Sequence, residues 1–105
     1  MMELDFVSGD TWEFDVILKN PDGTDYQMDE RDQLWFNVKR RWSDPECAIN
    51  VVQHDTHFKI EPEQTSLFAG KYYCDIGIIF SNGDIYTVIP EINLIVRNKV
   101  KQYGD

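Results

Sequence analysis

One segment, residues 67–96, constrains the fold of this chain more than any other. Its first half places an apolar residue at every second position, which is the period of a β-strand with one buried face. The members of this alternating set are Tyr72, Cys74, Ile76, Ile78 and Phe80. Asn82-Gly83 then predicts an antiparallel hairpin with a type I′ turn, because that turn needs positive φ at both central residues. The returning strand runs to Val96 past Pro90, which we expect at an edge or a bulge because it cannot donate a ladder hydrogen bond.

Shorter strand patterns fill most of the remaining sequence. They predict strands at residues 4–6, 12–19, 34–38, 49–51 and 58–60. Residues 61–67 predict one helical turn with Pro62 near its start. Asn20-Pro21-Asp22-Gly23 predicts a turn, since Pro presets φ and Gly tolerates positive φ. Seven or eight short strands with turn signals between them indicate an all-β sandwich, with a small β-barrel as the alternative.

Gly70, Tyr72 and Cys74 have the spacing of the tyrosine corner of immunoglobulin-like domains. In that corner a Tyr two residues before a Cys bonds its hydroxyl to nearby backbone. No second Cys lies at residues 12–19, and Trp35 has the opposite parity to the core residues around it, so a disulfide-built antibody domain is excluded. We therefore predict an immunoglobulin-like antiparallel β-sandwich of seven or eight strands. The residues to which we assign structural roles are Gly70, Tyr72, Cys74, Asn82 and Gly83.

Composition limits the classes of partner. The 105 residues fit a single domain, residues 1–105, and carry 10 basic and 19 acidic residues for a net charge of −9. Such a charge repels phosphate backbones and anionic lipid, so we expect neither a nucleic-acid partner nor a membrane. The first residues lack the features of a signal peptide, and no apolar run approaches the ~18 residues of a membrane span. We expect synthesis in a cytoplasm, with Cys47 and Cys74 reduced.

Three groups of side chains are candidates for chemistry, and each has a structural alternative. His54 and His57 flank Asp55 as a partial metal site, but on a strand the two histidines face opposite sides. The carboxylates between Asp22 and Asp32 offer calcium ligands, but their spacing is not that of an EF-hand, so a polar loop is favoured and cation binding stays open. Cys74 lacks the exposure that a nucleophile needs. We expect no catalytic residue, metal or cofactor.

Several short motifs resemble those of one family. These motifs are Gly9-Asp10-Thr11, Asp22-Gly23-Thr24 and the segments 69–76, 82–89 and 94–96. In this pattern the chain resembles small structural proteins encoded by phages and prophages of Firmicutes, and it is similar to the N-terminal, virion-anchoring domain of upper baseplate proteins. The resemblance implies an immunoglobulin-like sandwich that is made in the host bacterial cytoplasm and joins a tail, baseplate or capsid assembly. It implies no catalytic residues.

Apolar residues on the second face of the strands predict a protein–protein contact surface. The outer face of a free sandwich is mostly polar, whereas Tyr, Trp and Ile are typical of contact surfaces. The predicted interface residues are Trp35, Trp42, Tyr73, Ile79, Tyr86 and Ile95. A bulge that shifts the alternation would instead turn some of them toward the core. We expect a virion structural protein that binds itself, as a homo-oligomer, and other virion proteins; the alternative is a soluble acidic inhibitor or adaptor that binds a host protein.

Overall fold

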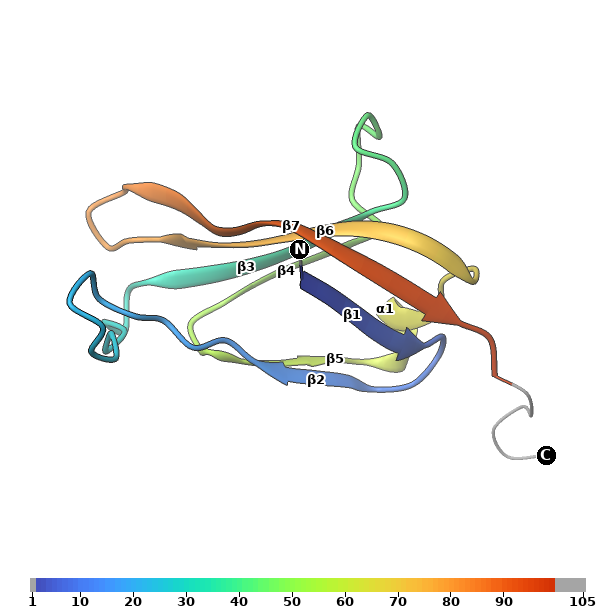
Figure 1. Cartoon of the computed structure of the whole chain (residues 1–105), viewed down its shortest axis with the longest axis horizontal. Helices are drawn as coiled ribbons and strands as arrows, with labels where there is room; N and C mark the ends of the chain where they lie inside the picture. The colour runs from blue at the N-terminus through green and yellow to red at the C-terminus, as the bar shows by residue number, and fades with distance from the viewer. Residues whose placement is uncertain (1, 100–105) are drawn as a thin grey trace.

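Two β-sheets pack face to face in the computed structural model, which describes residues 2–99 (Figure 1). The larger sheet has the strand order β1-β7-β6-β3-β4, and the smaller sheet pairs β2 with β5. The strands are β1 (Met2–Val7), β2 (Trp12–Asp15), β3 (Gln33–Lys39), β4 (Ile49–Gln53), β5 (His57–Ile60), β6 (Gly70–Ile79) and β7 (Ile85–Arg97). A single helical turn, α1 (Pro62–Thr65), links β5 to β6. The predicted all-β sandwich is confirmed, and the barrel alternative is not.

The core lies between the two sheets and follows the predicted alternation. In β3, Leu34, Phe36 and Val38 are fully buried, while the residues between them are half-buried on the outer face. From the smaller sheet, Trp12 and Phe58 are also fully buried. Aromatic rings fill much of this space, and Phe14 lies 5.0 Å from Phe36 and 5.1 Å from Phe58 between ring centroids. Burial of these large side chains is the main stabilising contribution to the sandwich.

The larger sheet is mixed rather than wholly antiparallel, which corrects the prediction. β1 pairs with β7 in parallel, from Met2 opposite Ile92 to Val7 opposite Arg97. A bidentate ion pair joins the two strands near the end of this pairing. Arg97 Nε donates to Asp5 Oδ1 at 2.7 Å, and Arg97 Nη2 donates to Asp5 Oδ2 at 2.8 Å. In an immunoglobulin-like sandwich, the strands named C, F and G belong to one sheet, and B and E belong to the other. Strands β3, β6 and β7 have the places of C, F and G here, and β2 and β5 form the opposite sheet.

Tyr72 forms the predicted tyrosine corner. Its ring is buried, and its hydroxyl donates to the backbone oxygen of Phe68 at 2.7 Å. The Arg40 guanidinium lies 4.8 Å from the centre of the Tyr72 ring. Gly70 has φ +140°, a backbone conformation that favours glycine, whereas the contact of a Cβ with Arg40 Nη1 at 2.6 Å could be relieved by movement of the flexible Arg40 side chain. Tyr72 and Cys74 are thus both buried, as the alternation predicts.

The β6–β7 hairpin is present, but its turn differs from the predicted type I′ turn. Phe80 N donates to Asp84 O at 2.8 Å, and Gly83 N donates to Phe80 O at 2.9 Å. These bonds enclose a three-residue loop with a single left-handed residue, Gly83, at φ +93°. No non-glycine residue within 2–99 has positive φ, so Asn82 does not adopt the conformation that a type I′ turn requires. Asn82 instead accepts a hydrogen bond from Asp84 N at 2.9 Å.

β7 contains two irregularities where it pairs with β6. The successive pairs are Cys74–Ile92, Ile76–Ile89 and Gly77–Thr87. β7 therefore gains one residue over β6 at each step, and Pro90 lies in the first of them, as predicted. Each extra residue reverses the alternation, so the two together restore it. As a result Tyr86 lies opposite Ile78 and shares its inner face, and the prediction that Tyr86 lies on the outer face is wrong.

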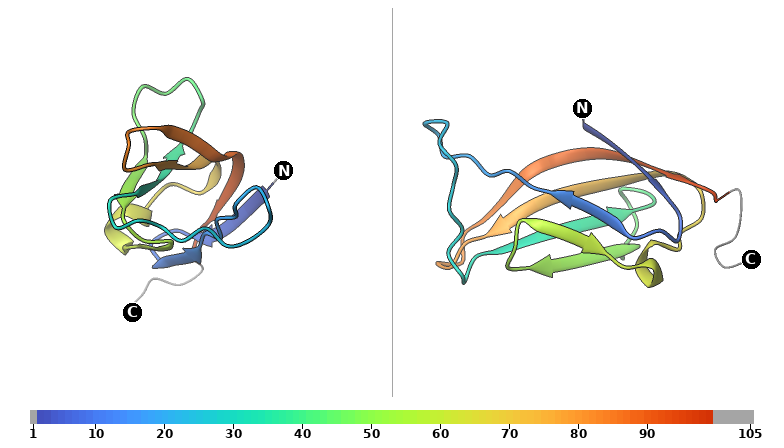
Figure 2. Two further views of the ribbon diagram at one scale, coloured as in Figure 1. Left: turned by 90° about the vertical axis from the view of Figure 1, so that its left-hand side faces the viewer. Right: turned by 90° about the horizontal axis from the view of Figure 1, so that it is seen from below.

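The molecule is 48 Å along its longest axis, and two loops lie together at one end of it. Residues 20–25 and the hairpin turn at 81–84 lie at the same end, as both views show (Figures 1 and 2). Residues 40–48, which follow β3, project away from the sheets elsewhere (Figure 1). The strands of the smaller sheet are four residues each, whereas β6 has 10 residues and β7 has 13. The larger sheet therefore extends beyond the smaller one.

Candidate protein-contact surfaces

The outer face of the larger sheet carries Trp35 as its central side chain. Trp35 pairs with Gly77 across β3 and β6, and a Cβ on Gly77 would lie only 2.0 Å from the indole ring. Trp35 Nε1 donates to Asp75 Oδ1 at 2.9 Å. The absence of a side chain at Gly77 thus lets the indole lie flat on the sheet, where the hydrogen bond fixes its direction. The predicted outward orientation of Trp35 is confirmed.

A second group on this face combines aromatic and basic side chains. Trp42, from the loop after β3, lies 4.9 Å from Tyr73 between ring centroids and is 52% exposed. Lys71 Nζ lies 5.2 Å from the Tyr73 ring centre. We call this group the basic-aromatic patch, and its members are Lys39, Arg41, Trp42, Lys71 and Tyr73. The neighbouring Arg40 is not a member, because its guanidinium lies over Tyr72 on the inner face. A hollow of about 230 Å³ between the loop and the sheet is lined by Asn37, Lys39, Trp42, Cys47, Tyr73 and Asp75.

The remaining predicted interface residues are divided between faces. Ile79 and Ile95 are half-buried on the outer face, with Ile79 opposite Ile85 and Ile95 between Lys71 and Asp5. Tyr86 is 58% exposed but on the inner face, where its ring lies 5.7 Å from that of Phe80. The six residues therefore do not form one continuous patch.

The part of β7 at residues 85–91 has a free edge. β6 pairs with one side of it, while β1 pairs only with residues from Ile92 onward, so within residues 2–99 no strand lies on the other side. Three large apolar side chains on this stretch are exposed: Ile85 by 63%, Tyr86 by 58% and Val88 by 39%. We call residues 85–91 the β7 edge.

An apolar groove lies beside the β7 edge, at the opening between the two sheets. Its volume is about 350 Å³. Its apolar lining comes from Met2, Leu4, Phe14, Ile17, Ile76 and Ile89. Ile17 is 73% exposed and Met2 is 47% exposed, so water reaches apolar side chains that a longer neighbouring strand would cover. Alternation along single strands did not reveal that a groove separates the sheets here.

Asp32 is a buried structural carboxylate rather than a free loop ligand. Its Oδ2 accepts from the Tyr26 hydroxyl at 2.6 Å and from Asp29 N at 3.0 Å, and its Oδ1 accepts from Ser81 N at 2.9 Å. These bonds tie the loop before β3 to the hairpin turn. The hydrogen bond from Tyr26 is the main reason that the pKa of Asp32 lies below its usual value, and the same bond raises the pKa of Tyr26 to about 12.

The other acidic residues of the Asp22–Asp32 loop lie at its surface. Asp25 pairs with Lys19, and Asp29 lies 3.6 Å from Arg31 Nε. Asp22 accepts from Thr24 N at 3.0 Å, which is a local turn contact. Within residues 2–99, no group of three or more His, Cys, Asp or Glu side chains is placed to hold a metal ion. The burial of Asp32 could have been predicted from the sequence, because Asp32 lies two residues before Leu34 and so shares its core-facing parity.

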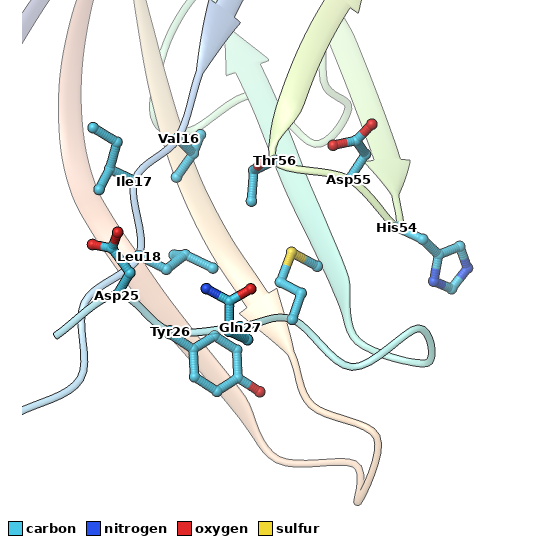
Figure 3. A pocket seen from close by; sticks show the side chains of 10 residues that line it. Val16, Ile17, Leu18, Asp25, Tyr26, Gln27, His54, Asp55 and Thr56 are labelled. Carbon is cyan, nitrogen blue, oxygen red and sulfur yellow. The ribbon is translucent and has the colours of Figure 1, made fainter.

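His54 and His57 do not form a common site. His54 Nδ1 lies 2.9 Å from the backbone oxygen of Asp32, and in Figure 3 its ring points away from the other labelled side chains around a shallow pocket. His57 lies on the exposed face of β5, with Nδ1 2.8 Å from Asp15 Oδ1 and Nε2 3.3 Å from Glu13 Oε1. The bond to Asp15, followed by that to Glu13, raises the pKa of His57.

Both cysteines are free thiols. Cys74 is buried in the core, and its burial, followed by the charge of Asp75, raises the pKa of the thiol to about 12. The thiol is therefore protonated near neutral pH and is a poor nucleophile. Cys47 is half-buried in the loop that carries Trp42.

Comparison with protein-family models and comparison with curated proteins each returned no match to this sequence. Among residues 2–99, no helix has the length and apolar character that crossing a membrane would require. The contact surfaces described above are therefore the features on which a function must be argued.

Proposed function

We propose that this protein is a structural or assembly component of a phage virion, associated with the tail, baseplate or capsid, and that it acts through protein–protein contacts. The observation that carries this proposal is the β7 edge with its exposed apolar residues. A free strand edge offers unpaired N–H and C=O groups to any passing strand. In an assembly, a neighbouring subunit covers such an edge.

Proteins that remain monomeric usually protect an edge with charged residues, and most of the β7 edge lacks them. Residues 85–89 read Ile-Tyr-Thr-Val-Ile, and the first charge after them is Glu91. Pro90 and the two irregularities protect only one end of the stretch. The apolar groove beside it adds Met2 and Ile17 to the exposed surface. Large exposed apolar patches are uncommon on monomers and are typical of contact sites.

The assignment to a virion rests on the resemblance of the strand and turn motifs to structural proteins of Firmicutes phages. Under this proposal the protein is not an enzyme, its partners are copies of itself and other virion proteins, and it acts in the virion after synthesis in the host cytoplasm. The buried, protonated Cys74 and the separate partners of His54 and His57 support a structural rather than a catalytic role.

The contact surface is tested by the mass of the purified protein in solution, measured over a range of concentrations. We expect the wild type to associate and the double variant Ile17→Lys, Val88→Lys to form smaller species than the wild type, with an unchanged circular dichroism spectrum. Phe68→Lys is the matched control, because Phe68 is 90% exposed and its substitution also replaces an apolar residue by Lys. A double variant that folds and associates like the wild type would show that the β7 edge is not the contact.

The virion assignment is tested by the gene neighbourhood and by the protein content of purified phage particles. Tail and capsid genes alongside, with the protein present in the particles, support the proposal. The second candidate, an acidic inhibitor or adaptor of a host protein, is favoured by the net charge of −9, which suits a basic partner. A lysogeny or defence gene cluster, with the protein absent from particles, would favour that candidate and overturn the virion assignment.

A further inference from the structure

We propose that the basic-aromatic patch of one copy binds the acidic end of a second copy, so that the subunits join head to tail. The acidic end is the loop at residues 20–32 together with the hairpin turn at 81–84. Its exposed carboxylates are Asp22, Asp25, Asp29, Glu30 and Asp84. This inference rests on the proposed assembly function and names a partner for the basic-aromatic patch, which lies apart from the β7 edge and from the groove beside it.

The positive charges of the patch are not neutralised within the subunit. Lys19, Arg31, Arg97 and Lys99 each pair with a carboxylate. Across residues 2–99, no ion pair involves the three cations of the patch, which are Lys39, Arg41 and Lys71, and outside the patch the same holds for Arg40 and Lys59. In a chain with a net charge of −9, the patch thus gathers three cations without a carboxylate partner on one surface.

Carboxylates near the patch are directed at other groups. Asp44 accepts from the backbone N–H of Arg41 at 3.1 Å, and Asp75 accepts from Trp35 at 2.9 Å. Lys71 lies over the Tyr73 ring, so an aromatic face holds this cation at the surface without cancelling its charge. The cations of the patch can therefore form ion pairs with an anionic partner.

The acidic end has the complementary chemistry. Within residues 2–99, neither Glu30 nor Asp84 forms an ion pair, and the buried Asp32 holds the loop and the hairpin turn together through Tyr26 and Ser81. The exposed Ile85 and Tyr86 follow the turn directly. Charge complementarity thus comes with apolar side chains that suit the exposed Trp42 and the hollow beside Tyr73.

The two surfaces are different and lie on different parts of the molecule, as the positions of residues 20–25 and 40–48 in Figures 1 and 2 show. Contact between them is heterologous, so a pair of joined subunits still offers one free patch and one free acidic end. Such contacts close into rings or extend into filaments, which are the forms of assembly that tails and baseplates use under the proposed function.

The test is a charge swap. Arg41→Glu with Lys71→Glu reverses the patch, and Glu30→Lys with Asp84→Lys reverses the acidic end; none of the four side chains is buried. We expect each double variant alone to form smaller species than the wild type under low-salt conditions, because only the contact through the β7 edge is left to it. We expect an equimolar mixture of the two to regain association, because each subunit then finds an oppositely charged surface. Association should weaken as salt is added.

Arg41→Lys with Lys71→Arg is the matched control, since it keeps the charge and should associate like the wild type. A wild type that stays monomeric, reversed variants that associate unchanged, or a mixture that forms no larger species than either variant alone would each overturn the proposal. Binding of a single-stranded oligonucleotide that the patch reversal abolishes would assign the patch to nucleic acid instead. The proposed function stands or fails separately, on the Ile17→Lys, Val88→Lys variant and on the content of purified particles.

Discussion

Tyr72 and Tyr86 lie on the same inner face of the larger sheet, yet their surroundings differ. Tyr72 is 4% exposed and donates its hydroxyl to backbone, whereas Tyr86 is 58% exposed and has Phe80 as its aromatic neighbour. The difference arises because the smaller sheet covers only part of the larger one (Figure 1). Alternation sets the direction of a side chain, but burial depends on what lies opposite. One half of the inner face is therefore core, and the other half is available for contact.

The largest expected difference between the two halves is in stability. Phe36→Ala should lower the free energy of unfolding by about 3–5 kcal/mol, because Phe36 is fully buried among aromatic rings. Tyr86→Ala should change it by only about 0.5 kcal/mol, as is usual for exposed positions. Urea denaturation of both variants measures the two values. Similar losses would show that the hairpin end is as well packed as the core.

A smaller difference is expected when only hydroxyl groups are removed. Tyr72→Phe leaves the backbone oxygen of Phe68 without its buried partner, which should cost about 1–3 kcal/mol. Tyr86→Phe removes an exposed hydroxyl and should leave the denaturation midpoint unchanged. An unchanged midpoint for Tyr72→Phe would argue against a stabilising tyrosine corner.

The smallest effect is confined to acidic pH and concerns the link between the loop before β3 and the hairpin turn. The folded state lowers the pKa of Asp32, so its contribution to stability is present above the unfolded value of about 3.9 and is lost as the pH falls through the folded pKa. The wild type should therefore be more stable than Asp32→Asn at neutral pH. The difference in stability between the two proteins should narrow below about pH 4.

Thermal melts from pH 7 to pH 2 measure that gap, with Glu30→Gln as the control for an exposed carboxylate. The difference in stability caused by Asp32→Asn should also be smaller when both proteins carry Tyr26→Phe, because this change removes the hydrogen bond that contributes most to the lowered pKa of Asp32. A gap that stays constant with pH would mean that the carboxylate charge of Asp32 does not stabilise the fold.

Much of the sandwich could be predicted because its strands alternate cleanly and its turns use Gly and Pro. The buried residues of β3 and β6 follow the expected parity, and the spacing of Gly70, Tyr72 and Cys74 located the tyrosine corner. These features are local, since each depends on residues close together in the chain. Local patterns are what a single sequence reveals best.

The features that escaped prediction depend on residues distant in the chain. The parallel pairing of β1 with β7 leaves no sign in either strand. Tyr86 is a different case, because the two extra residues in β7 cancel one another. Alternation from Ile92 already gives Tyr86 the inner face, and the expected outward orientation was wrong on local grounds. The exposed β7 edge, like the parallel pairing, depends on where β1 and the smaller sheet end.

The parallel pairing of β1 with β7 also has a consequence for the order of folding. The partners of Leu4 and Phe6 are Leu94 and Val96, so the ribosome must make nearly the whole chain before β1 can join its sheet. Closing such a long loop is slow, and the hairpin of β6 and β7 can form first because its strands are adjacent. We therefore expect the apolar side chains of β1 to lack their partner strand during synthesis, and the pairing of β1 with β7 to form late in folding.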